Sequence, residues 1–329
     1  MKPAIILVPL AAIALASCDK AKNLADKASA AVKEKIADKA GTTTVKADDE
    51  LRKLVDQTPE GAIFRKDLPF PTKIEVRVTR RSELAGRFFQ SSAIEKRSEA
   101  VNGTRTQISK LERAGDQIRH TLEKSDFSVP DAENPDAEKK PANNPLQPNA
   151  PQESPKPVTF RKSGGTWKTN DSDGFHSAAL AKQLGPVLDQ LLIEDGLAPK
   201  PVWFSKRRIK QGEKLTITGD SLSMLFAGNV KGSVTITLDS FESVGGHPCG
   251  VFLISGDYSR KQFPDFDGTF TDEEVTIQSG KLWLSLIHPL VLREELDTIR
   301  TFKSGGQGGM VGRGQGTAKI SVTREWKKL

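Results

Sequence analysis

The sequence has only two cysteines, Cys18 and Cys249, among its 329 residues. A fold held together by several disulfide bonds is therefore excluded, and a hydrophobic core must stabilise the protein instead. Beyond the first 15 residues, no apolar run approaches the roughly 20 residues that a membrane-spanning helix needs. We therefore expect a folded body that does not span a membrane.

The sequence also lacks the residue patterns of common catalytic and metal sites. Its histidines stand singly, without a partner at the spacing of a metal site or a catalytic triad: His120, His176, His247 and His288. Neither a Gly-x-Ser-x-Gly nor a His-Glu-x-x-His motif occurs. His247-Pro248-Cys249 offers too few ligands for zinc, and we expect Cys249 to be a small buried residue that enters a strand. The sequence therefore predicts no cofactor and no catalytic site.

The positive charge of the protein is not concentrated in one place. The formal net charge is +7, and acidic residues accompany the basic ones in both halves of the chain. A protein dedicated to nucleic acid would gather its charge on one stripe, with aromatic residues between the charges. We therefore expect no nucleic-acid partner.

The first 18 residues carry the most specific motif of the sequence. One positive charge, Lys2, precedes an apolar stretch that runs to Leu15, which is typical of a short secretory signal. The motif Leu15-Ala16-Ser17-Cys18 follows, and it resembles the lipobox of bacterial lipoproteins. The resemblance implies that Cys18 receives a diacylglycerol on its thiol and, after cleavage, an acyl chain on its amino group, which together give stable membrane anchoring. The alternative is an ordinary signal peptide in which Cys18 has no role.

The residue after the lipobox cysteine indicates which membrane holds the protein. In enteric bacteria an aspartate at this position resembles the signal that keeps a lipoprotein in the inner membrane. Asp19 therefore implies a periplasm-facing lipoprotein of the inner membrane. Lys20 and Lys22 would then contact anionic lipid, at roughly 1 kcal/mol each.

Past the cysteine, residues 19–40 repeat small and apolar side chains at three- and four-residue steps. This pattern predicts a helix with a thin apolar stripe, which suits a tether better than a buried helix. A second short helix is expected over residues 48–57. We divide the chain into a signal peptide (1–17), a lipidated cysteine with helical tether (18–60), a first antiparallel β-meander (61–127), a Pro-rich disordered insertion (128–157), and a β-hairpin, amphipathic helix and second antiparallel meander (158–329).

Alternating apolar and polar residues predict the strands of both meanders. In the first half these are residues 73–79, 86–97, 104–111 and 117–124, with turns at Asn102-Gly103 and at residues 114–116. The Pro-rich segment has little to bury and is followed by a hairpin over 158–169, so it is interpreted as an insertion between strands rather than an interdomain linker. Later strands are expected at 232–242, 249–259, 273–279, 280–287 and 316–326.

Between the meanders, residues 177–194 predict a leucine-rich helix with a continuous apolar face. The fold class is therefore mainly β, with two antiparallel curved meanders or half-barrels and an intervening helix. The lipobox, the Pro201-Val202-Trp203-Phe204 strand, Lys210-Gln211-Gly212-Glu213 and the Gly-rich segment before Trp326 resemble a group of uncharacterised bacterial lipoproteins. In architecture alone the chain also resembles lipoprotein carriers of the bacterial envelope, in which a half-barrel wraps a helix and shelters acyl chains.

One acidic cluster and one basic run are further candidates for ligand-binding sites. A cluster of carboxylates is a candidate calcium site, because hard cations favour grouped oxygen ligands. Its spacing does not fit an EF-hand. The cluster consists of Asp265, Asp267, Asp272 and Glu273. The densest basic run, SKRRIK at residues 205–210, is either a solvated turn or a site for an anion or lipid headgroup: Lys206, Arg207, Arg208 and Lys210. The Gly-rich segment 304–316 lacks a phosphate-loop signature and predicts a hairpin loop.

Two functions remain open from the sequence. The first is a non-catalytic envelope lipoprotein that binds an apolar ligand or an envelope protein partner. A large apolar cavity would favour the ligand, whereas a collapsed core with an exposed apolar patch would favour the partner. The second is an extracytoplasmic hydrolase with a dispersed site, for which His288 and the carboxylates of residues 265–274 are the candidates.

Overall fold

The computed structural model describes residues 49–91, 96–128, 157–169, 188–261, 270–305 and 311–329. The chain divides into two units, Met1–Lys46 and Ala47–Leu329, and every described residue belongs to the second. Cys18, Asp19, the predicted helix over 19–40 and nearly all of the Pro-rich segment lie outside the described residues. In the part of the chain that is described, no helix is long and apolar enough to cross a membrane.

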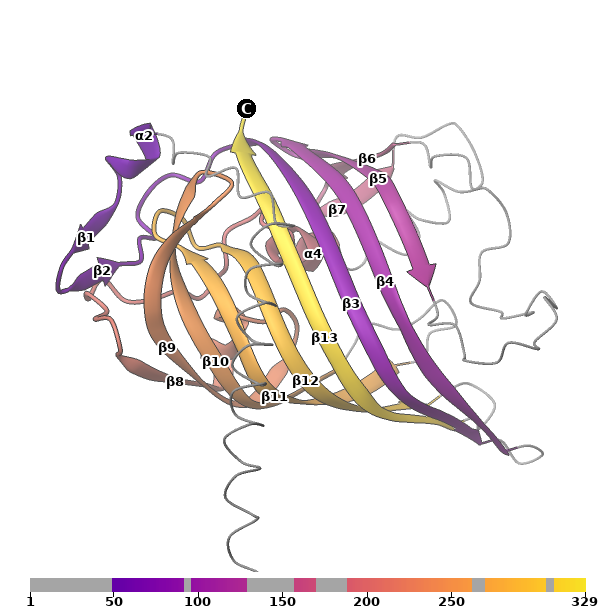
Figure 1. The fold of residues 1–329 in the computed structure, drawn as a ribbon. Coiled ribbons are helices and arrows are strands. Elements are labelled where there is room, and N and C mark those ends of the chain that lie inside the picture. The colour runs from indigo at the N-terminus through magenta and orange to yellow at the C-terminus, as the bar shows by residue number, and fades with distance from the viewer. Residues whose placement is uncertain (1–48, 92–95, 129–156, 170–187, 262–269, 306–310) are drawn as a thin grey trace, which may run out of the picture. The chain divides into compact units, whose positions relative to one another are not determined.

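The second unit is mainly β, which confirms the predicted fold class, and its largest element is an 11-stranded antiparallel sheet (Figure 1). The strands of this sheet are β3 (Lys73–Ser91), β4 (Lys96–Ala114), β5 (Gln117–Ser128), β6 (Val158–Ser163), β7 (Thr166–Thr169), β8 (Lys214–Thr218), β9 (Val230–Val244), β10 (His247–Lys261), β11 (Phe270–Ser285), β12 (Val291–Gly305) and β13 (Val311–Lys328). A separate hairpin pairs β1 (Asp56–Thr58) with β2 (Gly61–Ile63), and the described helices are α2 (Asp49–Arg52), α4 (Leu188–Glu194) and the 3-10 helix η2 (Gly219–Met224).

The two predicted meanders form one continuous sheet. Its order is β7-β6-β5-β4-β3-β13-β12-β11-β10-β9-β8, so sequence neighbours pair within each meander and β3 pairs with β13 between them. This central pairing runs from Ile74 opposite Lys328 to Ser91 opposite Val311. The sheet is not closed, and β7 and β8 form its two edges.

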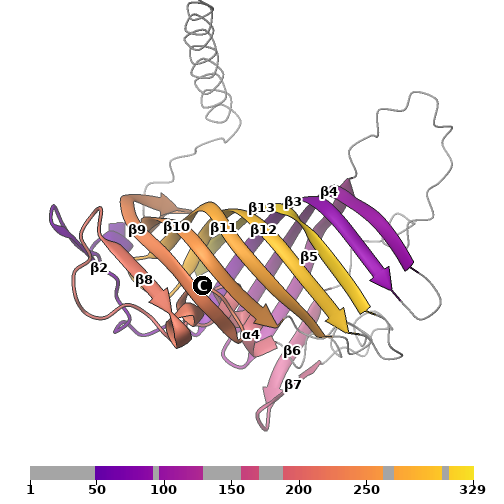
Figure 2. The ribbon, with the colours of Figure 1, turned by 90° about the horizontal axis from the view of Figure 1, so that it is seen from below.

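The sheet curves, and α4 lies on its concave face (Figures 1 and 2). Two groups of buried apolar side chains fill this side. One group packs around Phe64, Phe204 and Phe252 with η2, and the other joins the inner side chains of β3 and β13 to Leu188 and Leu192 of α4. Two-residue alternation places one set of side chains of each strand on this face, so burial of that set stabilises the curved sheet.

The predicted turn at Asn102-Gly103 is wrong. Both residues lie inside β4, where they face Ala85 and Leu84 of β3. Gly103 is needed for packing instead, because a Cβ atom there would lie 2.6 Å from the ring of Phe127 on β5. The turn predicted at residues 114–116 is confirmed, and Gly115 adopts a positive φ of 58° between β4 and β5.

Other predicted boundaries shift because strands run longer than their local pattern suggests. Ser279 and Gly280 do not separate two strands but lie within β11, where the register with β12 shifts. Of the Gly-rich segment, residues 304–305 belong to β12 and residues 311–316 to β13, and residues 306–310 lie outside the described residues. Of the other two predicted helices, 48–57 is helical only over α2, and the described part of 177–194 is helical over α4. Residues 177–187 lie outside the described residues.

A pair of glycines allows β3 and β13 to approach closely. Gly86 and Gly316 are opposite one another in the register. A Cβ atom on Gly316 would lie 2.5 Å from the carbonyl oxygen of Ala85 and 2.7 Å from Cα of Gly86. Backbone atoms cannot move aside as a flexible side chain does, so any larger residue must push the two strands apart.

We therefore expect Gly316→Val to lower the free energy of unfolding by about 1–3 kcal/mol, the usual cost of overpacking. Urea unfolding followed by circular dichroism measures the change. Ala85→Val is the matched control, because this neighbouring side chain is exposed and the substitution adds similar volume. Equal stability of the two variants would contradict a role for the glycine pair.

Candidate functional site

The structure assigns local partners to part of the basic run. Arg207 binds Glu213 with Nη1 2.5 Å from Oε1, and Arg208 binds Asp56 of β1 with Nη2 2.5 Å from Oδ1. Arg208 also donates to the carbonyl oxygen of Gly61, 3.0 Å away, so it fixes the β1–β2 hairpin. The lysines of the run are exposed, and their contact with a lipid headgroup stays a prediction: Lys206 and Lys210.

The calcium candidates do not share one environment. Asp265 and Asp267 lie outside the described residues. Asp272 is exposed, whereas the next side chain of the strand, Glu273, turns to the other face and is buried. The carboxylate of Glu273 is held by two guanidinium groups at 2.8 Å, those of Arg260 and Arg300. Among the described residues, no group of three or more acidic, histidine or cysteine side chains is placed to hold a metal ion.

His288 and the described carboxylates of β11 lie at opposite ends of that strand. Asp272, Glu273 and Glu274 are near its start, and His288 follows its last residue, Ser285. At a rise of about 3.3 Å per residue, the separation along the strand is on the order of 40 Å. These carboxylates and His288 therefore cannot act together in one hydrolytic site, which removes the described part of that hypothesis.

His288 belongs instead to a buried cluster with His247, Trp326 and Phe70. Nε2 of His247 lies 2.7 Å from Oγ of Ser285, which also accepts the backbone N–H groups of Ile287 and His288. Burial lowers the pKa of His247 to about 3 and that of His288 to about 4. Both imidazoles are therefore neutral at neutral pH and act in packing.

Cys249 is fully buried, as the sequence predicts, and burial raises the pKa of its thiol far above the ordinary value. Its Sγ donates to the carbonyl oxygen of His247, 3.3 Å away. A buried thiol held in its protonated form is a poor nucleophile and metal ligand. Its role is structural.

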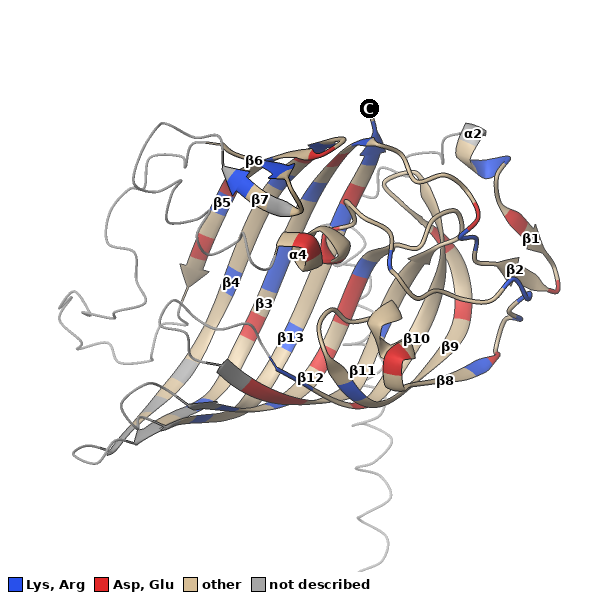
Figure 3. Ribbon diagram, turned by 180° about the vertical axis from the view of Figure 1, so that it is seen from behind, with Lys and Arg blue, Asp and Glu red and all other residues tan. Residues whose placement is uncertain are grey.

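A charged cavity of about 200 Å³ lies on the inner face of the sheet, between the strands and the chain around α4 and η2. Bands of basic and acidic residues on β3, β12 and β13 pass next to α4 (Figure 3). Five cationic side chains and two carboxylates line the cavity. They are Arg80 on β3, Lys200 after α4, Arg260 on β10, Glu294 and Arg300 on β12, Arg324 on β13 and Glu194 on α4.

Ion pairs hold most of these groups in place. Arg80 binds Asp195, which directly follows α4. Glu273 bridges Arg260 and Arg300 from β11, at 2.8 Å from each. Because the partners come from different strands and from the segment after α4, the network fixes that segment against the sheet.

Arg324 is the exception within this network. It is only 5% exposed, and its Nη2 donates to Oε1 of Glu294 at 2.7 Å. Its Nε and Nη1 atoms are buried and have no hydrogen-bond partner among the described residues. A buried guanidinium with unpaired donors is costly, because nothing replaces the water that it lost on folding. Of the buried side-chain atoms without a partner among the described residues, these two are the ones that belong to a charged group, so they make the cavity a candidate site.

Burial and charge set the protonation of the cavity. Burial lowers the pKa of Lys200 to about 8, and the nearby positive charge of Arg324 acts in the same direction. Burial raises the pKa of Glu194. Burial would also raise the pKa of Glu294, but the charge and hydrogen bond of Arg324, with the charges of Lys200 and Arg80, together outweigh it and lower this pKa. The cavity is therefore net positive at neutral pH, since its cations outnumber its ionised carboxylates.

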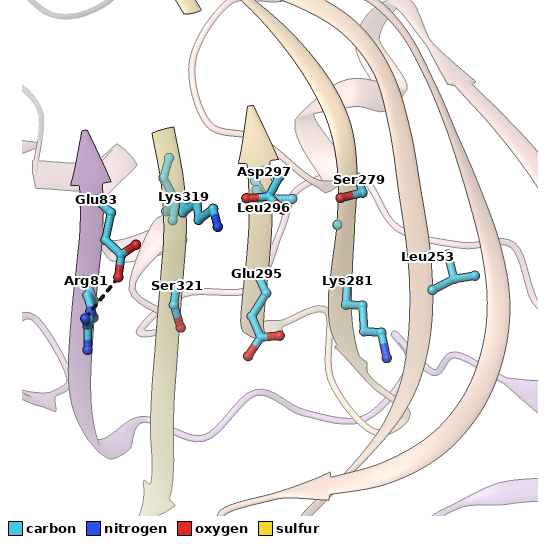
Figure 4. Close-up of a pocket in the computed structure, with 12 residues that line it drawn as sticks. Arg81, Glu83, Leu253, Ser279, Lys281, Glu295, Leu296, Asp297, Lys319 and Ser321 are labelled. Atoms are coloured by element: carbon cyan, nitrogen blue, oxygen red, sulfur yellow. Dashed lines mark hydrogen bonds and ion pairs between the residues drawn. The ribbon is translucent and has the colours of Figure 1, made fainter. Parts of the chain in front are cut away.

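A second hollow, an open groove of about 400 Å³, crosses the outer face of the sheet (Figure 4). It extends from Arg81 and Glu83 on β3 to Leu253 on β10. Between them, charges of both signs come from Lys281, Glu295, Asp297 and Lys319. Leu253 is 42% exposed and is one of the few large apolar side chains that the described surface presents.

No family model matches the chain. No curated protein matches it either. The cavity must therefore be interpreted from its own chemistry.

The sequence contains a signal for the inner cavity, although none of the site residues predicted from the sequence lines it. Arg324 stands between Val322 and Trp326 in the two-residue alternation of β13, so it occupies a position that faces the core. Glu294 also occupies a position that faces the core, on β12 between two buried leucines. A charged residue in phase with buried apolar ones indicates a buried polar site. The pattern alone does not show that the two strands meet.

The buried imidazoles give a testable dependence of stability on pH. A histidine pKa below its unfolded value of about 6.5 means that the unfolded chain binds more protons in acid. We expect the free energy of unfolding to fall as the pH drops below 6.5, by about 1.4 kcal/mol per pH unit for a fully buried imidazole. Urea midpoints of wild type and His247→Asn, measured between pH 7 and pH 4.5, test this.

The variant should lose less stability in acid than the wild type, because one of the titrating imidazoles is absent. His247 is 1% exposed, so its removal should show most clearly. The same loss in both proteins would mean that other groups carry the acid sensitivity.

Proposed function

We propose that the chain is a non-catalytic binding protein of a bacterial cell envelope, anchored by lipid on Cys18. The four lipobox residues, Leu15-Ala16-Ser17-Cys18, support the anchor, and Asp19 favours the inner membrane. The short apolar stretch before them suits export rather than spanning. The folded unit, Ala47–Leu329, would then face the periplasm.

The ligand best supported by the structure is small and polar, and it binds in the inner cavity. Large apolar clusters already fill the concave face around α4 and η2 in the described residues. The cavity that remains there, about 200 Å³, is smaller than the roughly 300–1,000 Å³ that usually encloses a drug-sized ligand. The observation that carries this proposal is the pair of unpaired donors, Nε and Nη1 of the buried Arg324. An acyl chain would satisfy neither atom.

A protein partner is the second candidate, and the outer groove favours it. The groove combines the exposed Leu253 with charges of both signs across five strands. Such a mixed surface is common in protein interfaces. One exposed leucine is a weak signal beside two buried, unpaired nitrogen atoms, so the cavity ranks first.

The anchor is tested by Cys18→Ala, which removes the sulfur needed for the thioether. We expect the variant to lose acyl labelling and to leave the membrane fraction or to accumulate in uncleaved form. Metabolic labelling with a fatty acid and membrane fractionation measure both effects. Equal labelling and membrane retention of variant and wild type would exclude a lipid on Cys18.

The same cells show which membrane holds the protein. Density-gradient separation of the two membranes should place the wild type with the inner membrane and move Asp19→Ser to the outer one. A wild type that already sediments with the outer membrane would show that Asp19 is not a retention signal. That result would leave the proposed lipid anchor on Cys18 unaffected.

Lys200→Met tests binding in the cavity. The substitution removes a buried charge and keeps a similar volume, so the ligand-free protein should be as stable as the wild type or more stable. In thermal melts of the full chain with small organic anions, amino acids and laurate, we expect a small polar compound to raise the melting temperature of the wild type but not of the variant. Stabilisation by laurate alone would favour an apolar ligand instead.

A further inference from the structure

The cavity that we propose as the binding site has an excess of positive charge. Five cations line it; three carboxylates pair with them, and burial raises the pKa of the fourth nearby carboxyl, Glu194. Asp195 binds Arg80, Glu273 binds Arg260 and Arg300, and Glu294 binds Nη2 of Arg324. In a buried, low-dielectric site, this excess attracts an anion much more strongly than it would at the surface.

Two of the cations still have donors to offer. Arg324 presents Nε and Nη1, which hold most of the N–H groups of a guanidinium. Lys200 is 6% exposed, and the one hydrogen bond described for its Nζ, to the carbonyl oxygen of Leu225, is 3.4 Å long. An ammonium carries three donors, so this single long contact leaves most of its capacity unused.

The number of donors favours an anion with several oxygens. The Nε–H and the N–H groups of Nη1 point to different edges of the planar guanidinium, so one anion reaches only one of these edges. A phosphate group presents oxygens in more directions than a carboxylate, so it can accept from one free edge of Arg324 and from Lys200 at once. Guanidinium and ammonium groups both bind phosphate well, and charge-assisted bonds of this kind are about twice as strong as neutral ones. The volume of about 200 Å³ suits a phosphate group with a small substituent.

We propose that the inner cavity binds a phosphate-type oxyanion, free or as the phosphate of a small phosphorylated group, through Arg324 and Lys200. This inference rests on the proposed function, because it names the ligand class of the same cavity. The buried side chains of Phe226, Val291 and Val322 supply apolar walls beside the anion. The bound phosphate accepts from a donor of Arg324 that has no partner among the described residues.

The test uses the full, lipid-bearing chain in detergent and measures binding by calorimetry and by the shift in melting temperature. The probes are inorganic phosphate, glycerol 3-phosphate, succinate and vesicles of phosphatidic acid, with phosphatidylcholine vesicles as the blank. We expect inorganic phosphate or glycerol 3-phosphate to bind and to stabilise the wild type. Tighter binding of glycerol 3-phosphate and phosphatidic acid would identify a headgroup, and phosphate binding alone would identify the free ion.

Arg324→Gln should weaken phosphate binding by at least about tenfold, since it removes charge-assisted bonds in a buried site. Arg313→Gln is the matched control, because Arg313 is an exposed arginine of the same strand and its loss should leave binding unchanged. If Arg324→Gln does not fold, the double variant R324Q/E294Q removes both charges of the ion pair and takes its place. Phosphate binding that survives the loss of Arg324 overturns the proposal.

The failure of this inference is distinguishable from failure of the proposed function. Succinate binding that depends on Arg324, without any phosphate binding, overturns the phosphate assignment but keeps a polar ligand in the cavity. The absence of binding by every polar probe here and in the Lys200→Met experiment overturns both.

Discussion

The pairing of β13 with β3 is the interaction on which the rest of the structure depends. It joins the end of the chain to the first long strand and makes one sheet out of two meanders. It also places Arg324 of β13 beside the strand that carries Arg80. A register shift by one residue would turn each of these inner side chains to the outer face, so the pairing determines both the core and the charged cavity.

Buried charge is the unusual feature of this sheet. Desolvation of a cation costs several kcal/mol and is offset only by close, well-placed partners. Most cations of the cavity have such partners, and these come from neighbouring strands or from the chain after α4. Arg324 is compensated on one nitrogen only. Apolar residues would stabilise the same space at lower cost, so stability alone does not explain the arrangement.

The local pattern of the sequence was sufficient where neighbouring residues decide the structure. The alternation in β3, the turn at Gly115 and the burial of Cys249 all follow from short-range chemistry. The local pattern gave a wrong prediction at Asn102-Gly103, a pair with strong turn propensity. There, pairing with β3 and the ring of Phe127 on β5 outweigh that propensity, and neither can be recognised from the sequence around the glycine.

The sequence by itself determined the fold class and the alternation of inner and outer side chains. The proposed localisation of the protein also comes from the sequence, through the lipobox. Each depends on residues that are close along the chain. Only the tertiary structure decided that the two meanders share one sheet and that the cavity is charged rather than apolar. Arg80, Lys200 and Arg324 lie far apart in sequence, and they line one cavity because β3 pairs with β13 and the segment after α4 packs across both. Long-range strand pairing leaves no periodic trace in the chain, so no local pattern reveals which buried charges will meet.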